Sequence, residues 1–199
     1  MEGMASIVVG LDFSDCSRVA LSHARRLASW AGAQIHPVHI VDTLIDEVRD
    51  DAALTPIQRG IHAGLVDDAR KSWEAFIEGI PEAPRLDLDV TVSHRLVGIR
   101  QQLDRHNADL LVLGAYGDEK PNVGMGTFAS ACVRSLPSDV LIVRDNYNDA
   151  FRTIVVGVDF SPTSRRALEV ATLIANGEGA RLYAAHVVPD SVDTYARLR

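Results

Sequence analysis

The stretch Ile7–Val41 recurs 147 residues further along the chain as Ile154–Val188. The two stretches align without a gap, and 17 of the 35 paired residues are identical. Ungapped identity of this extent indicates a duplicated structural unit. The chain is therefore expected to fold as one domain that is followed by the opening portion of a second copy.

Each copy begins with a short apolar run, rich in β-branched residues, that predicts a strand. Small and apolar residues then recur at spacings of three and four, which predicts an amphipathic helix with Ser14 or Ser161 as its N-cap. A second strand is predicted at 34–41 and again at 181–188. Pro37 lies within that strand and cannot donate a ladder hydrogen bond, so a local bulge is expected there.

After residue 56 the first copy continues to alternate between helical and strand patterns. Helices are predicted at 57–80, 96–106 and 127–136, and strands at 87–93, 109–113 and 140–143. Such alternation favours an α/β fold in which a doubly wound, five-stranded parallel sheet carries helices on both faces. The second copy supplies only a partial β-α-β unit.

The repeat also divides the chain into expected domains. We expect a complete domain over 1–145, a linker over 146–152 and a partial second domain over 153–199. A single β-α-β unit cannot cover both faces of its sheet. The second copy is therefore expected to pack against the first domain, to pair with another chain, or to be the start of a longer tandem protein. We prefer the third explanation.

Composition excludes several classes of protein. The net charge of −7 argues against a nucleic-acid surface, because neutralising phosphates requires clustered Lys and Arg. No apolar run approaches the roughly 18 to 20 residues that cross a bilayer, and the N-terminus lacks the pattern of a signal peptide. A cytoplasmic protein that binds neither membrane nor nucleic acid is expected.

The sequence offers no recognisable catalytic or metal-binding set. Cys16 and Cys132 stand in unrelated contexts, so no disulfide is predicted and a buried thiol is the expectation. His36 and His39 are three apart on a predicted strand and point to opposite faces. No zinc-ligand spacing, Gly-x-Ser-x-Gly elbow or Walker-type loop occurs. We therefore predict no catalytic residue and no metal site other than nucleotide-bound magnesium.

The segment 109–127 is the one that indicates chemistry. A predicted buried strand ends at Gly114, a loop with Gly117 follows, and Gly126 and Thr127 open a helix. Glycines let backbone amides approach an anion, and a helix N-terminus offers unpaired N–H donors. The Thr127 hydroxyl could both cap the helix and bind a phosphate oxygen. These residues and Asp12 would meet at the carboxyl ends of the strands, where open parallel sheets bind ligands.

The same residues have plainer explanations. Gly114 and Gly117 could simply form the turn between a strand and a helix, since Gly-x-x-Gly alone is a weak signal. Asp12 at a strand end could cap the next helix, a task for which Ser14 competes. Both explanations stay open at the level of the sequence.

Several motifs together resemble the universal stress protein family. They are the first strand ending in Asp-x-Ser, the Ala-rich first helix, the Gly-x-x-Gly…Gly-Thr loop and the closing strand Ser138–Arg144. The resemblance covers residues 5–145 and, as a partial domain, about 153–190. It implies a sheet like that of the adenine nucleotide alpha hydrolases.

The resemblance further implies an ATP site. In ATP-binding members the loop reads Gly, two residues, Gly, nine residues, Gly, then Ser or Thr. Carried over, the loop residues would hold the phosphates and ribose, Asp12 would lie near the base and ribose, and Val41 would offer its backbone to adenine. The implied loop residues are Gly114, Gly117, Gly126 and Thr127.

This loop departs from the family pattern. Only the eight residues 118–125 separate Gly117 from Gly126, and they open with Asp118 and Glu119. A carboxylate close to a triphosphate is repulsive by about 1 kcal/mol or more per pair. Lys120 offsets one of these charges, and a magnesium ion could turn the acids into ligands.

Three functions follow from these patterns. The first is a stress-associated regulatory protein that binds ATP, with nucleotide modulating an assembly or a partner. The second is a non-nucleotide interaction module, and the third is a slow ATPase or phosphotransferase. In the family the last strand commonly pairs across a two-fold interface, so a homodimer through the edge strand Val140–Val143 is expected.

Overall fold

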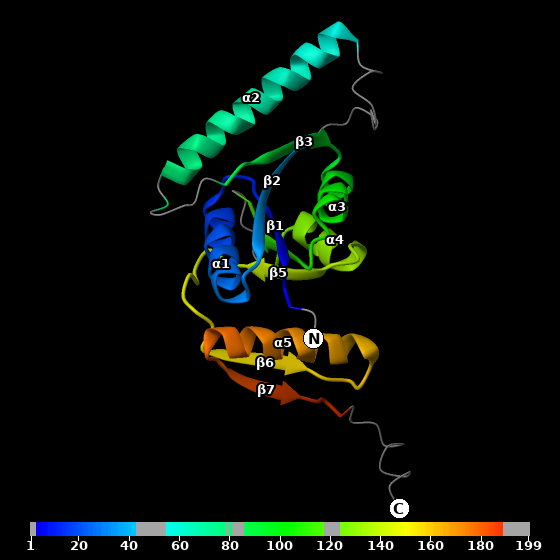
Figure 1. Ribbon diagram of the computed structural model, residues 1–199. Coiled ribbons are helices and arrows are strands. Elements are labelled where there is room, and N and C mark those ends of the chain that lie inside the picture. Colours follow the sequence, from blue (N-terminus) through cyan, green and yellow to red (C-terminus); the bar gives the residue numbers. More distant parts are fainter. Residues whose placement is uncertain (1–2, 43–54, 79, 81–85, 118–123, 189–199) are drawn as a thin grey trace, which may run out of the picture. The chain divides into compact units, whose positions relative to one another are not determined.

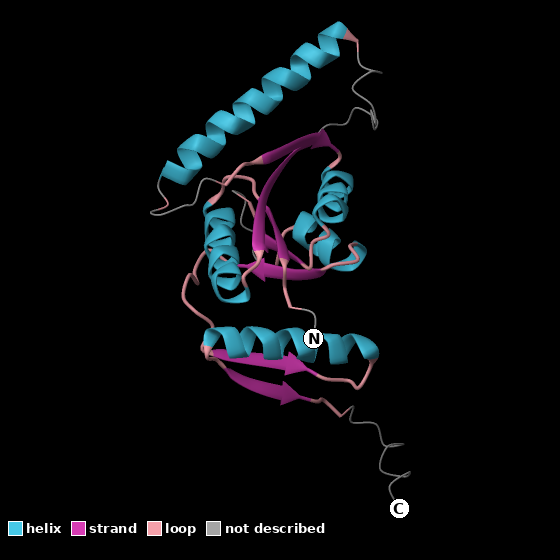
Figure 2. Ribbon diagram, viewed as in Figure 1, coloured by secondary structure: helices cyan, strands magenta, loops and turns pink. Residues whose placement is uncertain are grey.

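The structure, a computed structural model, describes residues 3–42, 55–78, 80, 86–117 and 124–188. The chain divides into two compact units, Met1–Asn148 and Asp149–Arg199. Strands and helices alternate within each unit, as Figures 1 and 2 show.

The first unit is built on a five-stranded sheet in the order β3-β2-β1-β4-β5. All four strand pairs are parallel, which confirms the predicted sheet. β1 and β4 are covered on both faces, and the apolar side chains of β1 are fully buried, as expected for an interior parallel strand. The strands are β1 (Ser6–Gly10), β2 (Gln34–Asp42), β3 (Asp89–Ser93), β4 (Leu110–Gly114) and β5 (Asp139–Val143).

Four helices complete this doubly wound unit. α1 and α2 contact each other on one face, where Arg18 reaches the end of α2, and α3 and α4 lie on the other face (Figure 1). Ser14 caps α1 by accepting a hydrogen bond from the Ser17 amide, and Gly32 ends it with a φ of 70°. The helices are α1 (Asp15–Ala31), α2 (Pro56–Glu78), α3 (Arg95–His106) and α4 (Thr127–Ser135).

Pro37 does not cause a bulge, so that expectation is wrong. The register between β1 and β2 runs without interruption from Ser6↔Gln34 to Gly10↔Val38. The Gln34 amide and the Val38 carbonyl both form hydrogen bonds on the β1 side. Successive residues of a strand direct their backbone polar groups to alternate sides, so the backbone nitrogen of Pro37 faces the β3 side. Pairing with β3 begins only at Val38, so no ladder bond is lost at Pro37.

The second unit repeats the opening of the first. β6 (Thr153–Gly157) and β7 (Arg181–Ala185) form a parallel two-stranded sheet that carries α5 (Pro162–Glu178), as predicted for the partial copy. Ser161 caps α5 through the Ser164 amide, and Gly179 ends it with a φ of 67°. α5 covers one face only: Val156 is 6% exposed, whereas its neighbour Val155 is 67% exposed.

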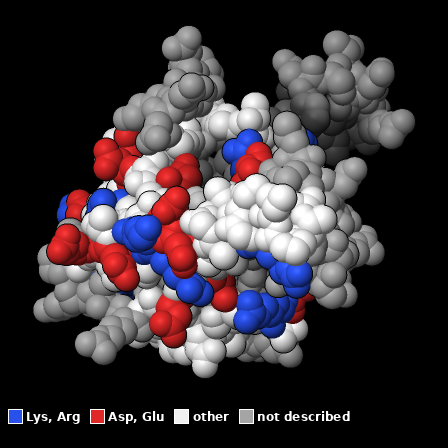
Figure 3. All heavy atoms as spheres, turned by 90° about the horizontal axis from the view of Figure 1, so that it is seen from above, with Lys and Arg blue, Asp and Glu red and all other residues white. Residues whose placement is uncertain are grey.

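The cysteines, the helices and the surface charges bear on further expectations from the sequence. Cys16 and Cys132 are free and buried, and burial raises the pKa of the Cys132 thiol to about 11. No helix among the described segments is long and apolar enough to cross a membrane. Acidic and basic side chains lie close to one another on the face that Figure 3 shows.

A cluster of titratable side chains joins β2, β3 and α3. The His36 and His106 rings stack with centroids 3.8 Å apart, and the His106 Nε2 atom lies 2.9 Å from Asp89 Oδ2. Arg105 pairs with the other Asp89 oxygen at 3.1 Å. Desolvation, followed by the nearby His106, lowers the pKa of His36, while Asp89 opposes the shift.

This lowered pKa predicts a loss of stability on mild acidification. The folded chain binds a proton at His36 less readily than the unfolded chain. The free energy of unfolding is therefore unaffected by this group above the ordinary histidine pKa of about 6.5 and decreases as the pH falls below it. Melting temperatures should therefore fall more between pH 7.5 and pH 5.5 for the native sequence than for His36→Phe, which keeps a ring against His106. Equal falls would contradict this role of His36.

Candidate functional site

A cavity of about 670 Å³ opens at the carboxyl ends of β1 and β4. The strand order reverses between these two strands, because β2 and β3 follow on one side and β5 on the other. Crevices at such switch points are where open α/β sheets bind ligands, and this volume lies within the usual range for small-molecule sites. The cavity is lined by residues 10–12, 17, 38–40, 95, 99, 113–117 and 126–129.

Five of the six residues singled out from the sequence line this cavity. They are Asp12, Gly114, Gly117, Gly126 and Thr127, which come from the end of β1, the end of β4 and the start of α4. The sixth, Val41, lies on β2 one residue beyond Ile40, which is the last lining residue of that strand. Its backbone contact with adenine stays a prediction.

The two carboxylate oxygens of Asp12 have different surroundings: one is bonded within the turn before α1, and the other faces the loop after β4. Its Oδ1 accepts hydrogen bonds from the Ser14 amide at 3.1 Å and from the Ser14 hydroxyl at 2.5 Å. Its Oδ2 lies so close to Gly117 that a Cβ at that glycine would stand 2.7 Å away. Asp12 therefore shapes the turn before α1, and Gly117 leaves room for the carboxylate beside the cavity. Ser14, not Asp12, provides the helix cap.

Gly114 has a clear packing role. A Cβ at this position would lie 3.1 Å from both the carbonyl carbon and the Cβ of Cys16, within the first turn of α1. The missing side chain lets the end of β4 approach that backbone, which is the plainer explanation for this glycine. Ala115 then continues the sheet by donating its amide to the Val143 carbonyl at 2.7 Å.

The N-terminus of α4 supplies the hydrogen-bond donors of the site. Gly126 is the N-cap, with no side-chain cap bond, and the first helical bond runs from the Ser130 amide to the Gly126 carbonyl. The amides of Thr127, Phe128 and Ala129 therefore have no acceptor within the helix, and all three residues line the cavity. An anion at this position would also meet the positive end of the helix dipole.

Two details of this helix differ from the sequence prediction. Thr127 is the first helical residue and not the N-cap, so its hydroxyl does not cap the helix and remains exposed toward the cavity. The Gly126 amide donates to the Ala115 carbonyl at 2.7 Å, so it is engaged in fixing the loop. The three amides that follow it have no acceptor among the described residues.

Sequence reasoning missed the cationic side of the cavity. Arg95, at the start of α3, lines it and places its guanidinium 5.4 Å from the centre of the Phe128 ring. Its Nε atom also pairs with Asp42 at 2.9 Å. A single arginine has no characteristic spacing in the sequence, and only the fold brings it beside α4. The acidic residues Asp118 and Glu119, with Lys120, lie outside the described residues.

Known proteins resemble this chain in sequence and in fold. The model of the universal stress protein family matches residues 4–144 and 150–198. A search of curated proteins finds no significant match. Among solved structures, universal stress protein UspA from Lactobacillus plantarum is 26% identical with a TM-score of 0.53, and the alignment covers 72% of this chain and 100% of that one.

A second solved structure extends over more of this chain. A universal stress protein from Archaeoglobus fulgidus is 17% identical with a TM-score of 0.61, and the alignment covers 97% of this chain and 71% of that one. At this identity the likeness concerns the fold alone.

The glycine contacts predict that two substitutions in the same loop differ in effect. Gly114→Ala forces a methyl group against the backbone of α1 and should lower the free energy of unfolding by about 1–3 kcal/mol. Gly126→Ala adds a methyl whose nearest neighbour is 3.4 Å away, at a φ of −61°, and should lower it by less than about 1 kcal/mol. Urea unfolding of both variants measures the difference, and equal losses would contradict the packing role of Gly114.

Proposed function

The chain belongs to the universal stress protein family, and from that premise we propose that its first unit binds ATP in the cavity between β1 and β4. In this proposal the protein is regulatory, and bound nucleotide modulates its assembly or its contact with a partner. The observation that carries the proposal is the meeting of Asp12, Gly117 and the N-terminus of α4 in one cavity.

The phosphates have a suitable environment at α4. The amides of Thr127, Phe128 and Ala129 can donate to phosphate oxygens, as helix N-termini commonly do. The exposed Thr127 hydroxyl adds a fourth donor at the same end. Arg95 contributes positive charge across the cavity, although Asp42 partly balances it.

The nucleoside end would lie toward β1 and β2. Asp12 Oδ2 is available to accept a hydrogen bond from a ribose hydroxyl, since Oδ1 already serves the turn. Val38 and Ile40 offer an apolar wall on the β2 side, next to the expected adenine contact of Val41. Magnesium would accompany the nucleotide phosphates; among the described residues, no group of three metal-ligating side chains is present.

The repeat provides a matched pair of variants for testing the site. Asp159 is the counterpart of Asp12, and its Oδ1 likewise accepts from the amide two residues on, at 3.0 Å. Asparagine keeps this acceptor and replaces the second oxygen by a donor. Asp12→Asn should weaken ATP binding about tenfold or more, whereas Asp159→Asn should leave it unchanged. Isothermal titration of the full chain with ATP and magnesium measures both.

The same experiment can reject the proposal. The native chain should show saturable binding at or below millimolar ATP, and denatured, freshly purified protein can be assayed for adenine nucleotide by chromatography. Absence of binding at millimolar ATP would defeat nucleotide binding in this cavity. An equal loss in Asp12→Asn and Asp159→Asn would assign the effect of Asp12 to the turn instead of the site.

One observation favours the second candidate function, an interaction module without nucleotide. Gly114 is explained by its packing on α1, so this member of the glycine pattern requires no ligand. A slow ATPase or phosphotransferase has no such support from the described residues. Binding of ATP without ADP formation over hours would separate the first proposal from the third.

We further propose that two chains associate through β5. Within the described residues β5 pairs only with β4 and lies at the edge of the sheet. The Val143 carbonyl bonds toward β4, so by alternation the N–H groups of Val140 and Ile142 point outward. An apolar edge with unpaired donors is suited to pairing with another strand.

The outward N–H of Ile142 makes this association testable. Ile142→Pro removes that donor without removing a ladder bond to β4, and Ile142→Ala removes the side chain but keeps the donor. In sedimentation velocity at micromolar concentration, the native chain and Ile142→Ala should be dimeric and Ile142→Pro monomeric. A native chain that is strictly monomeric would reject the interface.

A further inference from the structure

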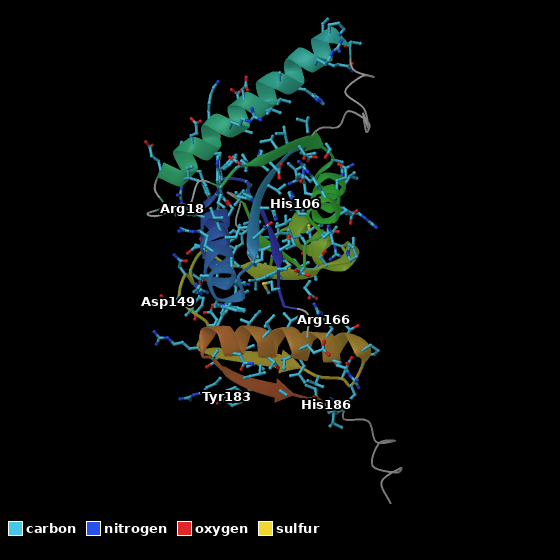
Figure 4. All side chains as sticks on the ribbon, viewed as in Figure 1. Arg18, His106, Asp149, Arg166, Tyr183 and His186 are labelled. Atoms are coloured by element: carbon cyan, nitrogen blue, oxygen red, sulfur yellow. The ribbon has the colours of Figure 1, made fainter. Side chains whose placement is uncertain are left out.

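An ion pair between Asp42 and Arg95 borders the cavity of the first unit. Arg95 is the first residue of α3 and lines the cavity, and Asp42 is the last residue of β2. Asp42 pairs with Ser93 in the register between β2 and β3, so the sheet brings its carboxylate beside the start of α3. α3, which ends at the His106 labelled in Figure 4, packs beside α4. The ion pair therefore joins the end of β2 to a helix whose first turn reaches the cavity.

The Asp42 carboxylate occupies the position of an anion at a helix N-terminus. Its Oδ1 atom accepts a hydrogen bond from the Arg95 backbone amide at 3.3 Å, and its Oδ2 atom lies 2.9 Å from Arg95 Nε. His94, the N-cap of α3, makes no side-chain cap bond, so this helix end takes its side-chain acceptor from β2. Unpaired amides and the positive end of the helix dipole attract anions. Asp42 thus acts as a built-in anionic ligand of α3 and of Arg95.

The Arg95 guanidinium also approaches the N-terminus of α4. Its Cζ atom stands 5.4 Å from the centre of the Phe128 ring, and Phe128 is the second residue of α4. The Phe128 amide belongs to the three at that helix end that have no acceptor among the described residues. Within the described part of the chain, the Nη atoms of Arg95 have no ion-pair or hydrogen-bond partner. A phosphate chain bound by the α4 amides would therefore meet a guanidinium that already holds a carboxylate.

The pair of Asp42 and Arg95 is open enough to exchange partners. The side chain of Asp42 is 42% exposed and that of Arg95 is 53% exposed. Ion pairs with this much solvent around them contribute little to stability. A guanidinium binds phosphate through two parallel, charge-assisted hydrogen bonds, and phosphate carries more charge than a carboxylate. A phosphate that reaches Arg95 would therefore displace the Asp42 carboxylate from it.

We propose that Asp42 is an internal competitor for the phosphate chain of the nucleotide, an inference that rests on the proposed function. In the free protein the Asp42 carboxylate holds the Arg95 guanidinium, and a bound phosphate chain takes the place of that carboxylate. Arg95 then distinguishes ligands by their phosphates, because adenosine has no group that can replace Asp42. The affinity for ATP is lowered by the ion pair that must first be broken.

The variant Arg95→Gln tests the selective role of Arg95. Glutamine removes the charge at a half-exposed position, so the fold should tolerate it. Isothermal titration of the full chain with ATP and magnesium should show binding about tenfold weaker or worse, because charge-assisted bonds to phosphate are lost. Adenosine binding, followed by ligand-observed NMR, should stay unchanged. Arg100→Gln removes the same charge from an exposed position of α3 that does not line the cavity, and it should alter neither affinity.

The variant Asp42→Asn should improve binding, which damage to the fold would not produce. Asparagine keeps an acceptor for the Arg95 amide and removes the negative charge. ATP should bind about threefold more tightly or better. Asp104→Asn makes the same change at an exposed position of α3 and should leave ATP binding as it is. In the double variant Asp42→Asn/Arg95→Gln the gain should vanish, because the carboxylate acts through Arg95.

Inorganic tripolyphosphate separates this inference from the proposed nucleotide function. It carries the phosphate chain without a nucleoside, so it requires only the α4 amides and Arg95. The native chain should bind it, Arg95→Gln should bind it more weakly, and Asp42→Asn more tightly. If these differences appear while the native chain binds no ATP at millimolar concentration, nucleotide binding fails and the competition between carboxylate and phosphate stands.

Other outcomes overturn the inference. Equal ATP binding by the native chain and by Arg95→Gln would leave nucleotide binding intact but remove Arg95 from it. An equal loss of ATP and adenosine binding in Arg95→Gln would assign Arg95 to the nucleoside. If Asp42→Asn binds ATP and tripolyphosphate no more tightly than the native chain, Asp42 is no competitor. A native chain that binds neither ligand defeats the inference together with the proposed function.

Discussion

The turn between β1 and α1 is the constraint on which the rest of the first unit depends. In three consecutive residues it directs the Asp12 carboxylate to the cavity, the Phe13 ring to α2 and the Ser14 hydroxyl to the first turn of α1. Phe13 holds a left-handed backbone, which for a residue with a Cβ is unfavourable by roughly 1–2 kcal/mol. Stacking on His39, whose Nδ1 atom is bonded to the Leu11 carbonyl, stabilises this conformation.

The second unit shows that this turn has a local origin. Phe160 adopts the same backbone conformation, although the described part of the second unit contains only β6, α5 and β7 and no counterpart of β4 or α4. The conformation therefore does not require the cavity to exist. Side-chain hydrogen bonds to Asp159 from Ser161 and Ser164 lower its pKa to about 2, so the carboxylate form is favoured even without a ligand. Asp12, a candidate residue of the nucleotide site, therefore also has a structural role in this turn that does not depend on a ligand.

Much of the fold was predictable because it is encoded by periodicity and repetition. The five parallel strands, the helices between them and the caps Ser14 and Ser161 follow from local patterns that the structure confirms. Pro37 was misjudged because an isolated strand does not show where its neighbour begins to pair. Which residues of a strand lack a partner depends on where the neighbouring strand of the sheet begins.

The candidate site was less predictable, for a related reason. Asp12 and the glycines were found because they follow strands or precede a helix in the sequence, and the structure gathers them in one cavity. The engagement of the Gly126 amide, the packing role of Gly114 and the presence of Arg95 all depend on contacts between distant segments.

The adjacency of β1 and β4 has a consequence for how the cavity comes into being during folding. Ile7 pairs with Leu110, so the two walls of the cavity belong to parts of the chain separated by about a hundred residues. Local units such as β1-α1-β2 can form from nearby contacts, whereas this pairing must first close a long loop. The cavity is therefore absent from any partly folded form that lacks β4. A ligand that binds there would draw the population toward the completed sheet by mass action, so occupancy would report that the whole domain has folded.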